Sequence, residues 1–271
     1  MKILIINRKW LRGFLPFLTN DEIFGITSGR YTAFGAYDEK TGIPVGCLTL
    51  WILPEDIRIV RFFTAPEYRG QGIARQLLAK AARQPKELHL PIRYIYSSGS
   101  GCVGFLEALG FEQHSTRCSY VVSTPEDIVK ITVPKEKLPF TIRPANSLPA
   151  NKIPDLVYRS PYDDLLQFPG GIVDMDRFSG ASPVCLEEGM VTGAVLAEER
   201  DDCVDILWYR GENTKAVYYM LRVLGNVLAE EISPRVQIRL LCYGPEENAA
   251  AKKFFSNSKS LGISIFELPG N

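Results

Sequence analysis

The sequence predicts a mixed α/β (α+β) protein in which one series of strands and helices occurs twice. Short apolar segments alternate with polar turns along the chain, which is typical of strands in a sheet. Two segments, 74–81 and 214–230, carry apolar residues at the spacing of a helix face. The order of segments in the second half follows that in the first, which favours a tandem duplication. With 271 residues, the chain is long enough for one large or two medium domains.

The composition is that of a globular protein, with 46% hydrophobic and 23% charged residues. The 31 Lys and Arg residues balance the 31 Asp and Glu residues, so the net charge is near zero. Broad nucleic-acid binding needs a surplus of basic charge, and we therefore expect no nucleic-acid partner. Apolar runs such as residues 45–53 are too short to cross a membrane. Residues 1–8 are interpreted as a first strand rather than a signal peptide, so no membrane association is expected.

The cysteines and histidines carry little functional signal. The six cysteines form no Cys-x-x-Cys pair, and the two histidines lie far apart in the sequence. Scattered cysteines of this kind are typical of small buried hydrophobic side chains, so we expect no metal site. Without an export signal, the protein is expected in the reducing cytoplasm.

The first half is predicted to form strands separated by short helices and turns. Residues 8–18 carry several bulky apolar side chains and are interpreted as a short helix or turn, whereas residues 19–29 have mixed polarity and are interpreted as irregular. Residues 38–42 contain turn formers and predict a hairpin. Residues 102–109 predict a helix that ends at Gly110. The predicted strands of this half are 2–7, 31–37, 45–53, 57–64, 91–97 and 112–122.

A loop with two glycines connects the strand at 57–64 to the helix at 74–81. The first N–H groups of a helix have no intrahelical acceptor and lie at the positive end of the helix dipole. Phosphate groups bind at such ends, and Gly70 and Gly72 lack the Cβ atoms that would keep a phosphate away. An ordinary strand-to-helix turn is the alternative. The loop has neither the Gly-Lys-Ser/Thr of a Walker loop nor the third glycine of a dinucleotide site.

The residues of this loop fit a known pattern. Arg69, Gly72 and Ala74 match (Gln/Arg)-x-x-Gly-x-(Gly/Ala). With the preceding Pro66-Glu67-Tyr68, the segment resembles the GNAT acetyltransferase superfamily, in which this loop binds the pyrophosphate of coenzyme A. The resemblance implies a mixed, mostly antiparallel central sheet flanked by helices, with acetyl-CoA as the cofactor and no metal. The cofactor-binding residues that it implies are Phe62, Phe63, Thr64, Arg69, Gly70, Gln71, Gly72, Ile73, Ala74 and Arg75.

A second stretch, Leu109-Gly110-Phe111, is also similar to this family. In the family, the position that corresponds to Leu106 is commonly a Tyr that serves as general acid, and the position of Gly99 is often an Asn. Neither side chain is present here. Tyr96, near the end of its strand, is the candidate for a substitute catalytic proton donor. The simpler interpretation is that Tyr96 is a packed aromatic residue with its hydroxyl at the rim.

The second half is predicted to repeat the order of the first. Residues 128–140, with two prolines, are interpreted as a strand followed by a linker, which divides the chain into an acetyltransferase domain at 1–133 and a degenerate GNAT-like domain at 140–271. An unrelated α+β domain is the alternative for this half. Its predicted strands are 141–145, 182–189, 191–199, 204–209, 236–243 and 263–268, and its predicted helices are 214–230 and 245–255.

The loop before the second long helix differs from the first in its chemistry. It reads Arg210-Gly211-Glu212-Asn213, so one glycine is replaced by Asn213 and a carboxylate is added at Glu212. A carboxylate repels a pyrophosphate, and the Asn side chain hinders close approach to the backbone. We therefore expect one cofactor per chain, bound by the first half, with the second half acting as scaffold and as one wall of the acceptor cleft.

Two functions are compatible with these observations. The resemblance implies an N-acetyltransferase that moves an acetyl group from acetyl-CoA to an amine by direct attack in a ternary complex. Its acceptor would be a small molecule or a peptide, and the protein a monomer or a homodimer. The alternative is a non-catalytic CoA-binding or partner-binding module, which Leu106 favours because it cannot donate a proton.

Overall fold

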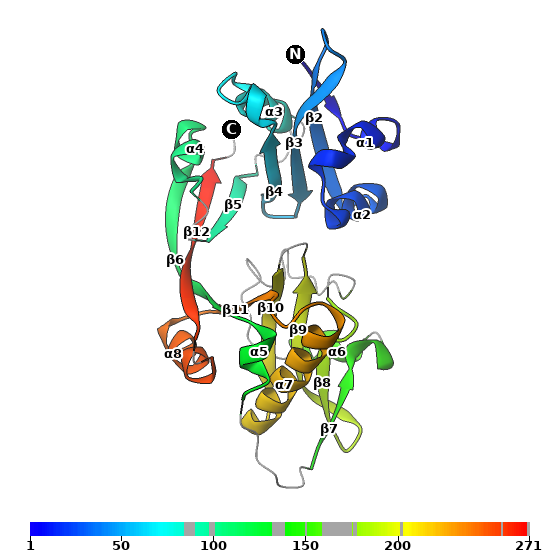
Figure 1. Ribbon diagram of the computed structural model, residues 1–271, viewed down its shortest axis with the longest axis vertical. Coiled ribbons are helices and arrows are strands. Elements are labelled where there is room, and N and C mark those ends of the chain that lie inside the picture. Colours follow the sequence, from blue (N-terminus) through cyan, green and yellow to red (C-terminus); the bar gives the residue numbers. More distant parts are fainter. Residues whose placement is uncertain are drawn as a thin grey trace. The chain divides into compact units, whose positions relative to one another are not determined.

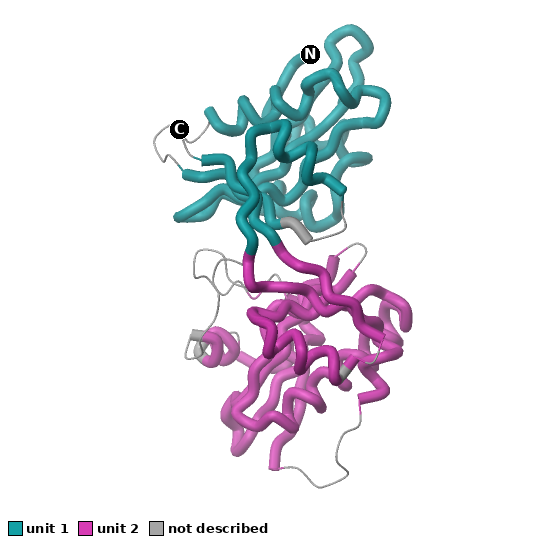
Figure 2. The backbone as a smooth tube through the Cα atoms, turned by 90° about the vertical axis from the view of Figure 1, so that its left-hand side faces the viewer, with its two compact units in different colours: residues 1–115, 264–271 teal, residues 116–263 magenta. Residues whose placement is uncertain are grey.

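The structure is a computed structural model of the chain. It describes residues 1–83, 90–97, 101–131, 139–149, 151–158, 175, 178–200, 203–255 and 257–269. The chain divides into two compact units (Figure 2). Unit 1 comprises Met1–Ser115 and Ser264–Asn271, and unit 2 comprises Thr116–Ile263.

Unit 1 is a sheet with helices on both faces (Figure 1). Its strands are hydrogen-bonded in the order β1-β2-β3-β4-β5, with β12 next to β5. Its elements are β1 (Lys2–Ile5), α1 (Arg8–Phe14), η1 (Leu15–Phe17), α2 (Asn20–Ser28), β2 (Tyr31–Asp38), β3 (Ile43–Ile52), β4 (Ile57–Thr64), η2 (Pro66–Tyr68), α3 (Ile73–Ala81), β5 (Ile92–Ser97), α4 (Val103–Ala108) and parts of β6 (Glu112–Ser123) and β12 (Lys259–Leu268).

Unit 2 repeats this arrangement around α7. Its strands follow the order β6-β11-β10-β9-β8-β7. Its elements are the remaining parts of β6 and β12 together with α5 (Pro125–Ile128), β7 (Thr141–Pro144), η3 (Ala145–Ser147), α6 (Lys152–Tyr158), β8 (Pro183–Glu187), β9 (Met190–Glu199), β10 (Cys203–Gly211), α7 (Thr214–Glu231), β11 (Gln237–Cys242) and α8 (Pro245–Phe254).

The strand directions are the same in the two units. Neighbouring strands in each meander are antiparallel, whereas β4 is parallel to β5 and β10 is parallel to β11. In both units the parallel pair flanks the long helix, α3 or α7. The predicted fold class, a mixed and mostly antiparallel sheet flanked by helices and duplicated along the chain, is confirmed.

Two hydrophobic clusters lie on opposite faces of the unit 1 sheet. Alternate residues of a strand point to opposite faces, and Phe34 and Leu48 belong to one cluster whereas Ala33 and Cys47 belong to the other. The first cluster packs against α3, whose buried residues have the predicted helix spacing. The second packs against the α1–η1–α2 segment. The side chains of α3 that are buried are Ile73, Leu77, Leu78 and Ala81.

The segment 19–29 was predicted to be irregular, and this prediction was wrong, because residues 20–28 form α2. Thr19 and Glu22 make a capping box: Glu22 N–H donates to Thr19 Oγ1 at 3.2 Å, and Thr19 N–H donates to Glu22 Oε2 at 2.9 Å. Gly29 ends the helix in the left-handed conformation, with φ 84°. Residues 128–140 also differ from the prediction, because Ile128 ends α5; residues 132–138 lie outside the described residues.

Each unit contains a strand from the other half of the sequence. In unit 2, β6 pairs with β11 from Ser119↔Cys242 to Ser123↔Ile238. In unit 1, Phe266 of β12 is 0% exposed in the α3 cluster, and Glu267 Oε2 lies 2.7 Å from Arg93 Nε. The compact units therefore differ from the predicted ranges 1–133 and 140–271. Figure 2 shows the two places where the chain passes from one unit to the other.

Candidate functional site

The edge of β4 that faces β5 is open along most of its length. The parallel pairing of these strands is confined to Ile57↔Ile92 and Arg58↔Arg93. A bulge follows, because Arg61 pairs with Thr49 while Ile59 pairs with Leu50, which leaves Val60 as the extra residue. Beyond Arg58, among the described strands, β4 is paired with β3 alone. Backbone groups on the β5 side of residues 59–63 therefore have no partner strand among those described and are available to a ligand.

The loop after β4 holds its two glycines in the left-handed conformation. Gly70 has φ 76° and Gly72 has φ 73°, a region that side-chain-bearing residues rarely adopt. No heavy atom lies within 4 Å of a Cβ built on either glycine. The space beside them is open, so a ligand can approach the backbone there without meeting a side chain.

The N-terminus of α3 has no side-chain cap. Gly72 is its N-cap residue, and Gln76 N–H donates to Gly72 O at 3.1 Å in the first turn. The N–H groups of the first turn, at residues 73–75, consequently have no intrahelical acceptor. Their dipoles add at this end of the helix, and no acidic residue lies in the first turn. This arrangement suits an anion such as a phosphate group.

Three side chains of the loop hold its shape. Arg69 Nε donates to Thr64 O at 3.2 Å, which ties the loop to the end of β4. Gln71 Nε2 donates to Glu67 O at 3.3 Å within the loop. Arg75 Nη2 donates to Ala108 O at 3.1 Å, and this bond joins α3 to the end of α4.

The structure places the predicted cofactor-binding residues in two groups. Residues 69–75 lie together around the uncapped helix end, although the Ile73 side chain points into the core. Phe62 and Phe63 point to opposite faces of β4: Phe62 packs at 5.4 Å from the Phe105 ring, and Phe63 at 5.0 Å from the Phe17 ring. The strand therefore presents its backbone at the open edge, with one aromatic ring on either side.

The position at which the resemblance to the GNAT family places a general acid is occupied by a core residue, Leu106. Leu106 is 2% exposed within the α3 cluster and carries no proton to donate. Tyr96 belongs to β5, but its side chain lies outside what the structure describes, as does Gly99. The proposed role of Tyr96 thus stays a prediction.

An ion pair on the α1–α2 face of the sheet was not predicted. Glu22 of α2 is 1% exposed, and its Oε1 accepts from Thr49 Oγ1 at 2.6 Å. Glu22 Oε2 lies 3.7 Å from Arg61 Nε on β4. The two residues are far apart in sequence, so no local pattern brings them together. The signals available were the Thr19-x-x-Glu22 spacing of a capping box and the arginines within the apolar stretch 57–64.

Cys47 lies next to this ion pair and is a thiol, not a thiolate. Burial raises its pKa to about 12, and the nearby charge of Glu22 acts in the same direction. A cysteine with so high a pKa is not an activated nucleophile. Cys47 is therefore not a candidate nucleophile.

The corresponding loop of unit 2 is closed to an anion by its own atoms. Asn213, the N-cap residue of α7, accepts a hydrogen bond from Lys215 N–H with its Oδ1 at 2.9 Å. Glu212 N–H donates to Thr192 O at 3.0 Å. Arg210 Nη2 pairs with Glu247 Oε1 of α8 at 3.2 Å. Beside them is a cavity of about 320 Å³ with a largely apolar lining, which includes Tyr209, Val217 and Leu221.

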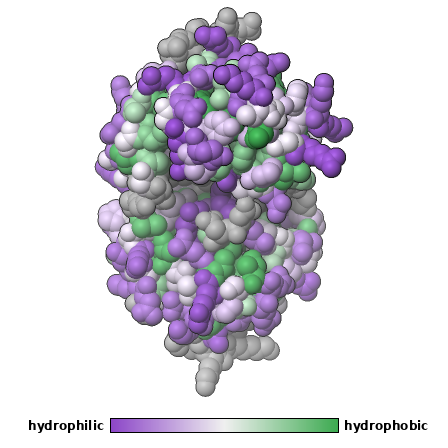
Figure 3. All heavy atoms as spheres, turned by 45° about the horizontal axis from the view of Figure 1, so that its top comes forward, coloured by the Kyte–Doolittle hydropathy of each residue, from purple (hydrophilic) through white to green (hydrophobic). Residues whose placement is uncertain are grey.

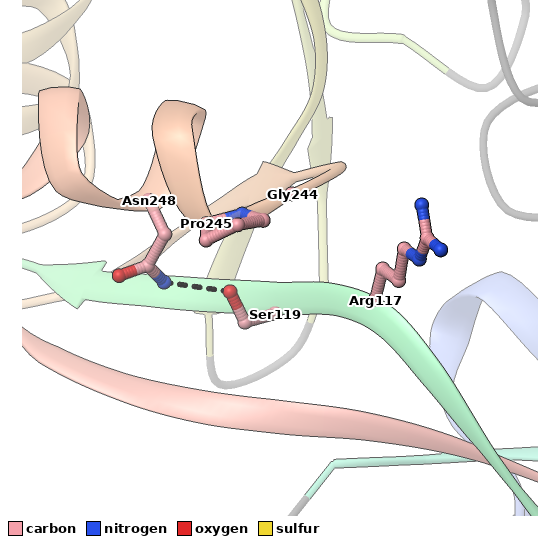
Figure 4. A pocket seen from close by; sticks show the side chains of 5 residues that line it. All are labelled: Arg117, Ser119, Gly244, Pro245 and Asn248. Carbon is pink, nitrogen blue, oxygen red and sulfur yellow. Dashed lines mark hydrogen bonds between the residues drawn. The ribbon is translucent and has the colours of Figure 1, made fainter.

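A second cavity in unit 2, of about 480 Å³, lies between β6 and the start of α8. Figure 4 shows the hydrogen bond between Asn248 and Ser119, in which Asn248 Nδ2 donates to Ser119 Oγ at 2.6 Å. The Arg117 side chain extends away from this pair (Figure 4). Ser119 and Asn248 are thus bonded to each other, and Arg117 is the charged side chain of the lining.

Two further features concern the surface and metal binding. Within the described ranges, no three His, Cys, Asp or Glu side chains are placed to hold a metal ion. None of the helices described here has the length and apolar character needed to cross a bilayer. Figure 3 shows polar and apolar residues intermixed on the face turned to the viewer.

Comparisons with known proteins agree with this geometry. A sequence profile of the acetyltransferase (GNAT) domain matches residues 29–113, a range that includes β4, the glycine loop, α3 and α4. No curated protein sequence matched the chain.

Several solved structures have a similar fold over the whole chain. A tandem GNAT protein from the clavulanic acid biosynthesis pathway has a TM-score of 0.71 and 13% identity, with coverage of 100% of this chain and 98% of that chain. A candidate acetyltransferase from Pyrococcus horikoshii has a TM-score of 0.60 and 11% identity, covering 99% and 90%. A GCN5-related N-acetyltransferase from Kribbella flavida has a TM-score of 0.54 and 13% identity, covering 97% and 70%. At these identities the likeness establishes the fold.

Proposed function

We propose that the protein transfers an acetyl group from acetyl-CoA to an amine, because residues 29–113 match the model of the GNAT acetyltransferase domain and the fold is similar to that of a tandem GNAT protein. The observation that carries the proposal is the uncapped N-terminus of α3 behind two left-handed glycines. This end offers unpaired N–H groups and open space, which is what the pyrophosphate of coenzyme A requires. The acceptor is a small molecule or a peptide.

The open edge of β4 suits the acyl arm of the cofactor. Acetyl-CoA supplies an acetyl group that is already activated as a thioester. The acceptor nitrogen forms a bond to the acetyl carbon as the carbon–sulfur bond breaks, and the proton lost by the amine ends on the departing sulfur. Backbone N–H groups after the bulge at Val60 are the donors available to hold the acetyl oxygen. The remaining contribution of the protein is to hold both reactants in a reactive orientation.

Tyr96 is the proposed route for the proton. We expect that Tyr96→Phe lowers kcat while the affinity for acetyl-CoA stays the same, because the substitution removes only a hydroxyl at the end of β5. Steady-state kinetics combined with calorimetric titration measure the two quantities separately. Equal kcat in the two proteins would remove Tyr96 from the mechanism and leave solvent water as the carrier.

A CoA-binding module without catalysis is the second candidate function. It is favoured by Leu106, which is buried in the core where the family commonly has an acidic hydroxyl group. Such a module would keep the phosphate site and use it to sense the cofactor or to bind a partner.

One pair of measurements separates the two functions. Calorimetry measures acetyl-CoA binding, and a thiol reagent measures the release of free coenzyme A in the presence of a broad panel of amines. We expect both binding and amine-dependent thiol release. Binding without release from any amine would support the module, and absence of binding would contradict both.

A further inference from the structure

Arg61 carries a guanidinium group that lacks hydrogen-bond acceptors. Its Nε atom is shielded from solvent, and no described residue accepts a hydrogen bond from it. Glu22 Oε2, at 3.7 Å, is close enough for attraction between charges but too far for a hydrogen bond. Both Glu22 oxygens already accept bonds, from Thr49 Oγ1 and Thr19 N–H. The side chain of Arg61 is nevertheless 38% exposed, so part of it faces solvent.

Other arginines of the chain show what such a group normally does. Arg93 contacts two carboxylates, at 3.1 Å from Asp56 and 2.7 Å from Glu267. Arg200 also contacts two, at 2.7 Å from Glu198 and 2.8 Å from Asp205. Arg61 has one carboxylate near it, that of Glu22 at 3.7 Å from Nε. Among the described residues it lacks the second carboxylate that Arg93 and Arg200 have.

Arg61 lies on β4, the strand whose open edge belongs to the candidate site. Arg61 lies at the bulge of β4, directly before Phe62, and shares the α1–α2 face with Phe63. Its guanidinium carbon is 5.7 Å from the centre of the Phe63 ring. The cofactor loop and α3 lie on the other face of the sheet. In a ternary complex, an acceptor that reaches the open edge of β4 from the α1–α2 face therefore passes Arg61, whose side chain is 38% exposed.

We propose that Arg61 binds a carboxylate of the acceptor, and hence that the acceptor is an amine that also carries an acid group, such as an amino acid. This inference rests on the proposed acetyl transfer. The planar guanidinium matches a carboxylate with two parallel hydrogen bonds. The buried carboxylate of Glu22 attracts the Nε side of the Arg61 guanidinium and so orients this positive charge on β4. Arg61 is thus a specificity-determining residue.

Matched pairs of acceptors test the proposal. Thiol release is measured with several amino acids and with their amides, which keep the amine but lose the negative charge. The wild type is expected to prefer the acids. In Arg61→Gln, the KM for the acids is expected to rise about tenfold or more, since a charge-assisted bidentate contact is lost, with little change for the amides. Arg61→Lys keeps the positive charge but cannot form two parallel hydrogen bonds to a carboxylate. It should therefore retain only part of the preference for acids over amides.

Arg12→Gln is the control, because Arg12 is an exposed residue in the last turn of α1 and its loss changes the net charge equally. Affinity for acetyl-CoA and the thermal midpoint are measured for each variant. A wild type without preference for acids would overturn the proposal. An equal loss of rate with acids and amides in Arg61→Gln would do the same.

A binding measurement decides the inference even if no acetyl transfer is seen. N-acetylated amino acids are titrated into wild type and Arg61→Gln in the presence of coenzyme A. Binding that depends on Arg61 supports the carboxylate site, whether or not the protein is an enzyme. Absence of binding, or equal binding in both proteins, contradicts it. Binding of a phosphorylated amine in place of the carboxylates would also contradict it.

Discussion

Gly72 and Asn213 are both N-cap residues, of α3 and of α7, and they leave their helices in different chemical states. The side chain of Asn213 accepts a hydrogen bond from Lys215 N–H and so takes the place of an external anion. Gly72 has no side chain and leaves the first turn of α3 open. A capped helix is more stable in isolation, whereas an uncapped one has donors left for a ligand. This single position accounts for the difference in side-chain capping between the two helix starts.

We predict that Gly72→Glu abolishes acetyl-CoA binding, because it places a negative charge where a pyrophosphate must approach. The left-handed φ of 73° adds backbone strain of about 1 kcal/mol for any side chain. Gly189→Glu is a matched control, since Gly189 has φ 80° and open space around it but lies in the β8–β9 hairpin. Calorimetry should show normal binding in the control and none in Gly72→Glu, with similar thermal midpoints. Unchanged affinity in Gly72→Glu would disprove the assignment of the loop.

Long-range pairs such as Glu22 and Arg61 could not be predicted from the sequence. Their contact depends on how α2 packs on the sheet, and each residue alone is equally compatible with a solvent-exposed position. Local motifs were more informative, since Gly70 and Gly72 lie in the predicted loop between a strand, β4, and a helix, α3.

At the scale of elements, strong periodicity was a reliable guide and weak periodicity was not. The helix predicted at 74–81 is α3, Ile73–Ala81, and the helix predicted at 214–230 is α7, Thr214–Glu231. The strands predicted at 182–189 and 191–199 correspond to β8 and β9, and the turn between them has positive φ at Glu188 and Gly189, as a type I′ turn requires. The helix α2 was missed, because its evidence is a capping box rather than an apolar face.

The difference between the N-termini of α3 and α7 predicts how many acetyl-CoA molecules each chain binds. We predict that acetyl-CoA saturates the protein at a single equivalent per chain, because α3 presents free N–H groups and α7 is capped by Asn213. Glu212 adds a carboxylate at the second loop and strengthens this expectation. Calorimetric titration of wild type and of Gly72→Glu measures it. Two equivalents in the wild type, or one remaining in the variant, would show that unit 2 binds the cofactor.

At the scale of the whole molecule, the two halves of the sequence exchange strands. Unit 1 contains Phe266, which is buried with Ile92 and Phe111, and unit 2 contains residues 116–123 of β6 together with Ile128. Burial of one Phe side chain stabilises a protein by about 1.5–3 kcal/mol, so each unit loses a substantial part of its stability without the exchanged segment. Sequence segments alone could not predict this pairing, because adjacent strands in a sheet need not be adjacent in the chain.

We predict that fragments 1–133 and 140–271 do not fold independently. Each would lack a strand and several core residues of its unit, which leaves an unpaired sheet edge and an incomplete core. Circular dichroism and denaturant titration of the separate fragments test this, and the control is their co-expression, which should restore a cooperative transition. Two fragments that each unfold cooperatively on their own would show that the predicted domain boundary is correct after all.

The strand exchange also constrains how the chain folds as it leaves the ribosome. Synthesis is vectorial, so β1 to β5 emerge long before Phe266 and Glu267 of β12 are made. Until then β5 lacks the strand that follows it in the sheet, and the cluster around α3 lacks Phe266. A nascent unit 1 is therefore open to pairing with other chains for most of its translation time. Slow translation or truncation near β12 is therefore expected to leave the whole of unit 1 incompletely folded, and not only the last residues. Such a chain would depend on chaperones to stay free of aggregation.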